Sequence, residues 1–310
     1  MWRSGFLESV HRGSLVVLDA DGVVTFAVGA VDRPILPRSA NKPVQATALL
    51  AAGWAPRSGN ELAIAAGSHN GEDGHRDLVA DMLAAAGLGA DDLGCPVALP
   101  QHEATRAAWI AGSRAPDRLA MNCSGKHAGM LSACVAAGWP TEGYLRRDHP
   151  LQQAIEARLA EAAGEPVTAV VVDGCGAPQH ALSVTGLARG LLSLVQAAAG
   201  SAERAVADAM RAHPWFMAGT GREDTDVMAA VPGLLMKGGA DGVHAAALPD
   251  GGAVALKLDD GGDRGRLPAL LAGLERLGAP LSGVTEWLQT PVIGGAAVVG
   301  SVRPGASLAR

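Results

Sequence analysis

Alternating apolar and polar positions mark two stretches, one near each end of the chain. Near the N-terminus, residues 14–18 and 23–28 are rich in β-branched side chains and flank Asp21-Gly22. Near the C-terminus, residues 243–248 and 253–258 flank a Pro-Asp-Gly-Gly turn. A glycine-containing turn between two such runs predicts a β-hairpin. Because both ends supply strands, we expect the two hairpins to share one sheet.

The middle of the chain has the apolar spacing of helices. Candidate helices span residues 72–86, 101–112, 124–137, 148–163, 185–199 and 201–212. Gly87, Gly138 and Gly164 follow three of them, at the position where glycine commonly ends a helix. Further expected elements are helices over 39–52 and 264–277, a short buried strand over 167–172 and an edge strand within 292–302.

This order predicts an α+β fold in one unit covering residues 1–310. Residues from about 1 to 38 and from 240 to 310 are expected to form a sheet lobe, and residues 39–239 a helical lobe. Such a chain is long enough to bury a core without disulfides.

Composition narrows the function classes. Hydrophobic residues make up 48% and charged residues 18% of the chain, which is an ordinary globular balance. The net charge of −6, without a run of Lys and Arg, argues against a nucleic-acid partner. The sequence has neither an apolar leader nor a run of about 18 apolar residues, so we expect a cytoplasmic protein without a membrane partner. Its four cysteines are then expected to be thiols or metal ligands.

A Ser-x-x-Lys pair opens the first expected helix. Ser39 and Lys42 are three residues apart, and residues at that spacing are neighbours on a helix. A serine hydroxyl becomes a nucleophile when a base lies beside it, and a neutral lysine can be that base. The alternative is a helix N-cap at Ser39 with a surface lysine. The position directly after a hairpin favours the catalytic interpretation, as in penicillin-recognising serine enzymes.

A second serine and a second lysine have weaker signals. Ser68 lies in a polar, glycine-flanked segment that enters a helix, so it is either an N-cap or a second pocket hydroxyl. Lys257 lies on an expected strand, on the same face as Ala253 and Ala255. It either projects over a cleft or guards an edge strand, and the edge interpretation is favoured.

A third cluster combines thiols and nitrogen donors. One helical turn would bring Cys123, Lys126 and His127 onto nearby faces, and Cys175 lies in a glycine-flanked turn after a strand. Two cysteines and a nitrogen donor could bind zinc if water completed the site. No Cys-x-x-Cys occurs, so buried packing is the alternative for these cysteines.

Together these segments resemble the asparaginase II-like family, the rhizobial-type or class 3 L-asparaginases. The resemblance is carried by residues 38–45 (RSANKPVQ), 68–72 (SHNGE), 122–127 (NCSGKH), 173–176 (DGCG), 219–225 (GTGREDT) and 255–261 (ALKLDDG). It extends over nearly the whole chain. Some members carry a further pocket cysteine near the position of Val243, which this chain lacks.

The resemblance implies a fold similar to serine β-lactamases and glutaminases, a homodimer, and hydrolysis of L-asparagine to L-aspartate and ammonia. It implies two Ser–Lys tandems, Ser39 with Lys42 and Ser68 with Lys257. It implies zinc bound by Cys123, Lys126 and Cys175. It also implies a substrate pocket lined by Arg38, His127 and Asp173.

These implications give a mechanistic hypothesis with two rivals. Ser39 attacks the side-chain amide of asparagine after Lys42 removes its proton, and Ser68 either relays protons or is itself the nucleophile. A glutaminase or another amidase, such as one acting on peptidoglycan, is the nearest rival. A non-catalytic zinc-binding protein is the second.

Overall fold

A five-stranded antiparallel sheet joins the two ends of the chain. The structure, a computed structural model, describes residues 1–308. Its main sheet has the order β4-β3-β11-β10-β9. The strands are β3 (Gly13–Leu18), β4 (Val24–Val28), β9 (Leu235–Gly238), β10 (Val243–Ala247) and β11 (Ala253–Leu258). In this sheet β3 from the first hairpin pairs with β11 from the second, as expected.

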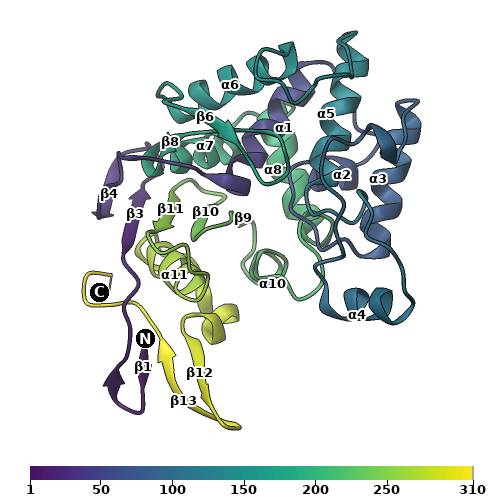
Figure 1. Ribbon diagram of the computed structural model, residues 1–310. Helices are drawn as coiled ribbons and strands as arrows, with labels where there is room; N and C mark the ends of the chain where they lie inside the picture. The colour runs from purple at the N-terminus through teal and green to yellow at the C-terminus, as the bar shows by residue number, and fades with distance from the viewer. Residues whose placement is uncertain (309–310) are drawn as a thin grey trace.

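Two helices cover the faces of this sheet (Figure 1). Helices α7 (Val184–Gln196) and α11 (Arg266–Arg276) both pack against β3, β10 and β11. Successive side chains of a strand point to opposite faces, and in β11 both Val254 and Ala255 are fully buried. The two helices therefore lie on opposite faces of the sheet. Thus α7 from the middle of the sequence belongs to the sheet layers.

The remaining large helices form the second lobe, at the top and on the right of Figure 1. They are α1 (Lys42–Ala51), α2 (Gly59–Ala65), α3 (Asp73–Ala85), α4 (Glu103–Ala111), α5 (Ser124–Ala137), α6 (Pro150–Ala163) and α8 (Ala202–Ala212). Helix α5 is buried from residue 124 to residue 134 and packs against α1, α2 and α3. Gly125 permits this packing, because a Cβ there would lie 2.7 Å from Ile64 of α2.

Several short elements complete the chain. Helix α9 (Pro214–Met217) and helix α10 (Glu223–Ala230) follow α8, and the 3-10 segments are η1 (Arg38–Asn41), η2 (Ala90–Asp92) and η3 (Leu281–Trp287). Two small ribbons pair β5 (Pro34–Ile35) with β8 (Leu182–Ser183) and β6 (Val170–Val172) with β7 (Pro178–His180). The described helices include none that is both long and apolar enough to cross a membrane.

The α+β class is confirmed, but two expected strands differ in detail. The strand predicted as buried within 167–172 is β6, and its Val171 and Val172 are exposed because it pairs only with β7. The expected edge strand within 292–302 is a hairpin, β12 (Thr290–Gly294) and β13 (Ala297–Val302). It forms a separate sheet with β1 (Trp2–Arg3) and β2 (Phe6–Leu7), which projects at the bottom of Figure 1.

Candidate active site

The segment carrying Ser39 is a 3-10 turn that leads directly into α1. Ser39 lies inside η1, and its side chain caps no helix, so the N-cap interpretation of this residue is wrong. Pro43 occupies the second position of α1, where its missing N–H costs no helical hydrogen bond. The turn lies against the end of β9, where a Cβ at Gly239 would be 2.6 Å from the Pro37 carbonyl oxygen. Only glycine permits so close an approach of the two backbones.

Lys42 is almost completely buried and directs its amine toward Ser68. Its Nζ donates to the Ser68 hydroxyl over 2.8 Å, to the Gly67 carbonyl over 2.6 Å and to the Cys123 sulfur over 3.1 Å. Among the described residues no hydrogen bond joins Lys42 to Ser39, and the Ser39 hydroxyl has no partner. The serine–lysine pair in direct contact is therefore Lys42 with Ser68.

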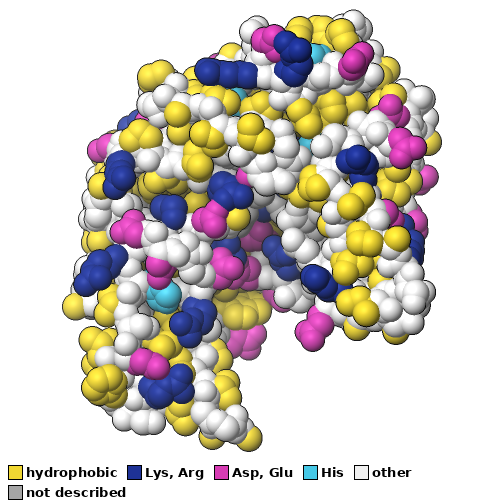
Figure 2. Space-filling model, viewed as in Figure 1, with side chains coloured by type: hydrophobic (Ala, Val, Ile, Leu, Met, Phe, Trp, Pro, Cys, Tyr) yellow, Lys and Arg dark blue, Asp and Glu magenta, His cyan; other side chains and the backbone are white. Residues whose placement is uncertain are grey.

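Both serines line one pocket of about 530 Å³, between the end of the sheet and the helical lobe. Its other lining side chains include Gln101, Asn122, Arg222, Glu223, Asp263 and Arg266. Figure 2 shows charged side chains of both signs gathered where this face of the molecule is hollowed. The volume is that of a small-molecule site, for which about 300–1,000 Å³ is typical. The polar lining suits a charged or strongly polar ligand.

Lys257 lies apart from this contact. Its strand, β11, is the centre of the five-stranded sheet, so the edge-strand interpretation is wrong. Its amine donates to the Asp241 carbonyl over 2.8 Å and to the Leu258 carbonyl. The structure does not bring Lys257 to Ser68, and the expected second tandem is not formed.

The three residues expected to bind substrate make their contacts with other side chains, outside the lining of this pocket. Arg38 pairs with Asp173 over 2.8 Å and also with Asp241. Arg38 also has φ +52°, a left-handed conformation that arginine rarely adopts. His127 donates to or accepts from the Tyr144 hydroxyl over 2.6 Å and is fully buried. None of Arg38, His127 and Asp173 is among the pocket-lining residues.

The three expected zinc ligands do come together behind Lys42. Cys123 and Cys175 pack in one small buried cluster, and Lys126 Nζ lies 3.2 Å from the Cys175 sulfur. All four cysteines are free. The buried imidazole of His127 lies beside the Cys175 sulfur and interacts with it, and its Nε2 atom has no other hydrogen-bond partner in the described chain. Two thiols and an amine at one buried point, with this atom beside them, fit a small closed zinc site.

Charge in this cluster is distributed unevenly. The hydrogen bond from Cys175, together with Lys42 and Lys126, holds the pKa of the Cys123 thiol well below its usual range. Burial alone would lower the pKa of Lys126, but the sulfurs of Cys175 and Cys123 raise it. Burial lowers the pKa of His127 to about 4, so this imidazole is neutral. The cluster is therefore an ammonium–thiolate arrangement before any metal binds.

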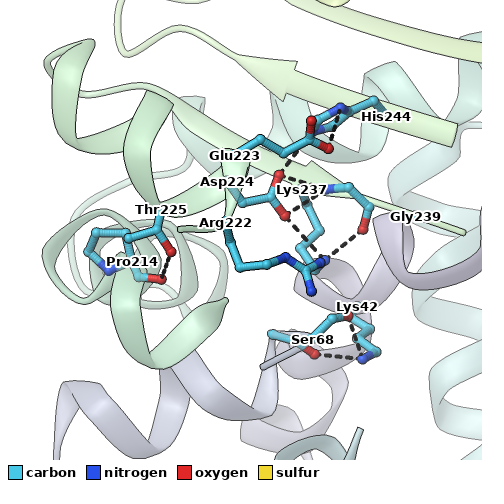
Figure 3. A network of polar contacts seen from close by, with 12 residues as sticks. Lys42, Ser68, Pro214, Arg222, Glu223, Asp224, Thr225, Lys237, Gly239 and His244 are labelled. Atoms are coloured by element: carbon cyan, nitrogen blue, oxygen red, sulfur yellow. Dashed lines mark hydrogen bonds and ion pairs between the residues drawn. The ribbon is translucent and has the colours of Figure 1, made fainter. Parts of the chain in front are cut away.

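A buried charge network, missed by sequence reasoning, supports the opposite wall of the pocket (Figure 3). Asp224 of α10 accepts hydrogen bonds from the Gly238 N–H over 3.0 Å and from His244 Nε2 over 2.9 Å. Its carboxylate also lies 3.6 Å from Lys237 Nζ. Burial would raise the pKa of Asp224, but Lys237 and His244 hold it well below its usual range. This network fixes Gly238 at the end of β9, and Gly238 and the following Gly239 line the pocket.

In the sequence, this network is indicated only by polar residues beside glycines, in segment 219–225 and at Lys237-Gly238-Gly239. The ligand atoms of Glu223, Asp224 and His244 lie within 4.8 Å of one another, which is a metal-like spacing. However, Lys237 pairs with Asp224, and Arg266 pairs with Glu223. These two cations already supply the positive charge, so we interpret the group as an ion-pair network.

Comparison with known proteins relates the chain to one family and to several solved structures. A family model described as L-asparaginase II matches residues 1–304. A beta-lactamase from Mycobacterium bovis is similar over 86% of this chain and 93% of that one, with 15% identity and a TM-score of 0.46. Mglu in its tris and glutamate form is similar over 89% of this chain, with 14% identity and a TM-score of 0.46. This chain covers 59% of that Mglu chain. No match was found among curated proteins.

Proposed function

Because the chain belongs to the L-asparaginase II family and is an amidohydrolase, we propose that it hydrolyses L-asparagine to L-aspartate and ammonia. The observation that carries the chemistry is the 2.8 Å contact between Lys42 Nζ and the Ser68 hydroxyl on the wall of the polar pocket. A lysine in hydrogen-bond contact with a pocket hydroxyl can take up, through that hydroxyl, the proton of an attacking serine, as covalent acyl transfer requires.

We assign the attack to Ser39, whose hydroxyl lines the pocket and has no partner among the described residues. The Ser39 oxygen bonds to the amide carbon, and its proton passes through the Ser68 hydroxyl to the amine of Lys42. The C–N bond then breaks, and the leaving nitrogen takes that proton and departs as ammonia. Water attacks the resulting ester by the same proton route, which releases aspartate and restores Ser39.

Zinc is part of this proposal, with Cys123, Lys126 and Cys175 as the residues that would hold it. When bound, zinc supplies a fixed positive charge that polarises nearby groups and favours neutral amines. Lys42 donates to Cys123, so the cluster and the proton acceptor are in direct contact.

A homodimer and a cytoplasmic location stay predictions.

The test is ammonia release from L-asparagine and L-glutamine by the purified wild-type protein and by Ser39→Ala and Ser68→Ala variants. Acid quenching followed by intact-mass measurement detects the acyl-enzyme. We expect asparagine-selective release by the wild type and neither release nor adduct with Ser39→Ala. An adduct that persists in Ser39→Ala but disappears in Ser68→Ala would transfer the nucleophile to Ser68. Preference for glutamine, or no release from either amide, would overturn the asparaginase assignment.

A further inference from the structure

The pocket contains one arginine whose charge is not neutralised by a carboxylate. Two arginines, Arg222 and Arg266, line the pocket. Arg266 pairs with Glu223 and, over 3.4 Å, with Asp263. Arg222 has no ion-pair partner within residues 1–308. Its positive charge is therefore available to a ligand.

The guanidinium of Arg222 is nevertheless held in place. Its Nη1 donates to the amide oxygen of Asn70 over 3.2 Å and to that of Gln101 over 3.0 Å. Asn70 is itself fixed, because its Nδ2 donates to the Thr220 carbonyl over 2.9 Å. These contacts are made to neutral oxygens, so they orient the side chain without cancelling its charge. Its other N–H groups have no partner in the described chain.

The position of Arg222 suits the recognition of a small substrate. Figure 3 shows its side chain between the Asp224–Lys237 pair and the Lys42–Ser68 pair. A planar guanidinium matches a carboxylate with two parallel hydrogen bonds, which a lysine cannot reproduce. Arg38, the arginine that the resemblance places in the substrate pocket, already pairs with Asp173 and Asp241.

We propose that Arg222 binds the α-carboxylate of the amino-acid substrate and makes the enzyme selective for amides that carry one. This inference rests on the proposed function and specifies it. The oriented guanidinium holds the carboxylate end, while the side-chain amide lies at the two serines. Glu223 and Asp263, the pocket carboxylates, pair with Arg266 and leave Arg222 uncompensated.

The experiment compares kcat and KM of wild type, Arg222→Gln and Arg222→Lys for three amides. They are L-asparagine, 3-aminopropanamide, which lacks the carboxylate, and succinamate, which lacks the ammonium group. Arg106→Gln, an exposed arginine of α4, is the matched control. For Arg222→Gln we expect kcat/KM for L-asparagine to fall about 10- to 150-fold, chiefly through KM, as for a lost charge-assisted contact. With 3-aminopropanamide, the variant and the wild type should be equal.

Two further outcomes separate this inference from the proposed function. If the wild type is active but Arg222→Gln keeps its KM and its preference for carboxylate-bearing amides, the role of Arg222 is refuted and the function stands. If the wild type hydrolyses none of the amides, the proposed function fails. L-aspartate titrated calorimetrically into wild type and Arg222→Gln then still tests the site, since binding must be present in the first and lost in the second. Equal binding, or none to the wild type, refutes it.

Discussion

Replacing Asp224 by asparagine should destabilise the fold strongly, although the two side chains have nearly the same shape. Asp224 is 2% exposed, and its carboxylate lies opposite Lys237, which is 1% exposed. Removing one member of a buried ion pair leaves the other charge uncompensated, which costs about 3–5 kcal/mol. Asparagine can still accept the Gly238 and His244 hydrogen bonds, so we expect a loss at the lower end, about 3 kcal/mol.

The assay is the free energy of unfolding from urea titrations at pH 7. Asp226→Asn is the matched control on the same helix. That carboxyl is only partly buried, so its replacement should change stability by no more than about 0.5 kcal/mol. Adding Lys237→Met to Asp224→Asn should recover part of the loss, with a coupling of about 1–3 kcal/mol. Equal effects of Asp224→Asn and Asp226→Asn, or simple additivity in the double variant, would refute the reasoning.

Three further predictions concern protonation, metal and backbone packing. Burial lowers the pKa of Lys237 to about 8 in the folded protein, whereas a lysine in the unfolded chain has a pKa of about 10.4. The free energy of unfolding of the wild type, relative to that of Lys237→Met, should therefore rise by about 3 kcal/mol between about pH 8 and about pH 10.4. A difference between the two urea-unfolding profiles that does not change with pH would contradict this prediction. Cys175→Ser should reduce the zinc that copurifies with the protein, measured by plasma mass spectrometry, whereas Cys134→Ser, which replaces a thiol outside the cluster, should not. Gly239→Ala should cost at least about 1 kcal/mol of stability in thermal unfolding, because its Cβ would meet the Pro37 carbonyl, and an unchanged melting temperature would show that the turn can shift.

The sequence predicted those elements whose signal is local. The hairpins of β3–β4 and β10–β11 follow from alternating apolar residues with a glycine turn between them. Helix α5 begins and ends at the predicted residues, because Gly138 adopts the left-handed conformation that ends a helix. The α+β class follows from this order of elements.

Contacts between distant segments were the part that local signals could not predict. Lys42 was expected to face Ser39 because they are neighbours in sequence, but its amine lies against Ser68, three residues beyond the end of α2. The resemblance implied that Arg38 lines the substrate pocket, but the fold places Asp173 and Asp241 beside it, and it pairs with them. Spacing along the chain says which side chains share a turn, whereas pairing across the core depends on how helices and strands dock.

The pairing of β3 with β11 sets the order in which this molecule can be completed. Leu18 lies opposite Ala253, so β3, the first strand of the β3–β4 hairpin, pairs with a strand that the ribosome makes near the end of synthesis. Such non-local pairing is slow, and an unpaired strand edge invites association with other chains. The nascent protein therefore passes through a long period in which its helical lobe can form while β3 stays open. A premature stop before residue 253 would leave a chain that contains Lys42, Ser68 and both cysteines of the cluster, yet exposes a strand edge for aggregation or proteolysis.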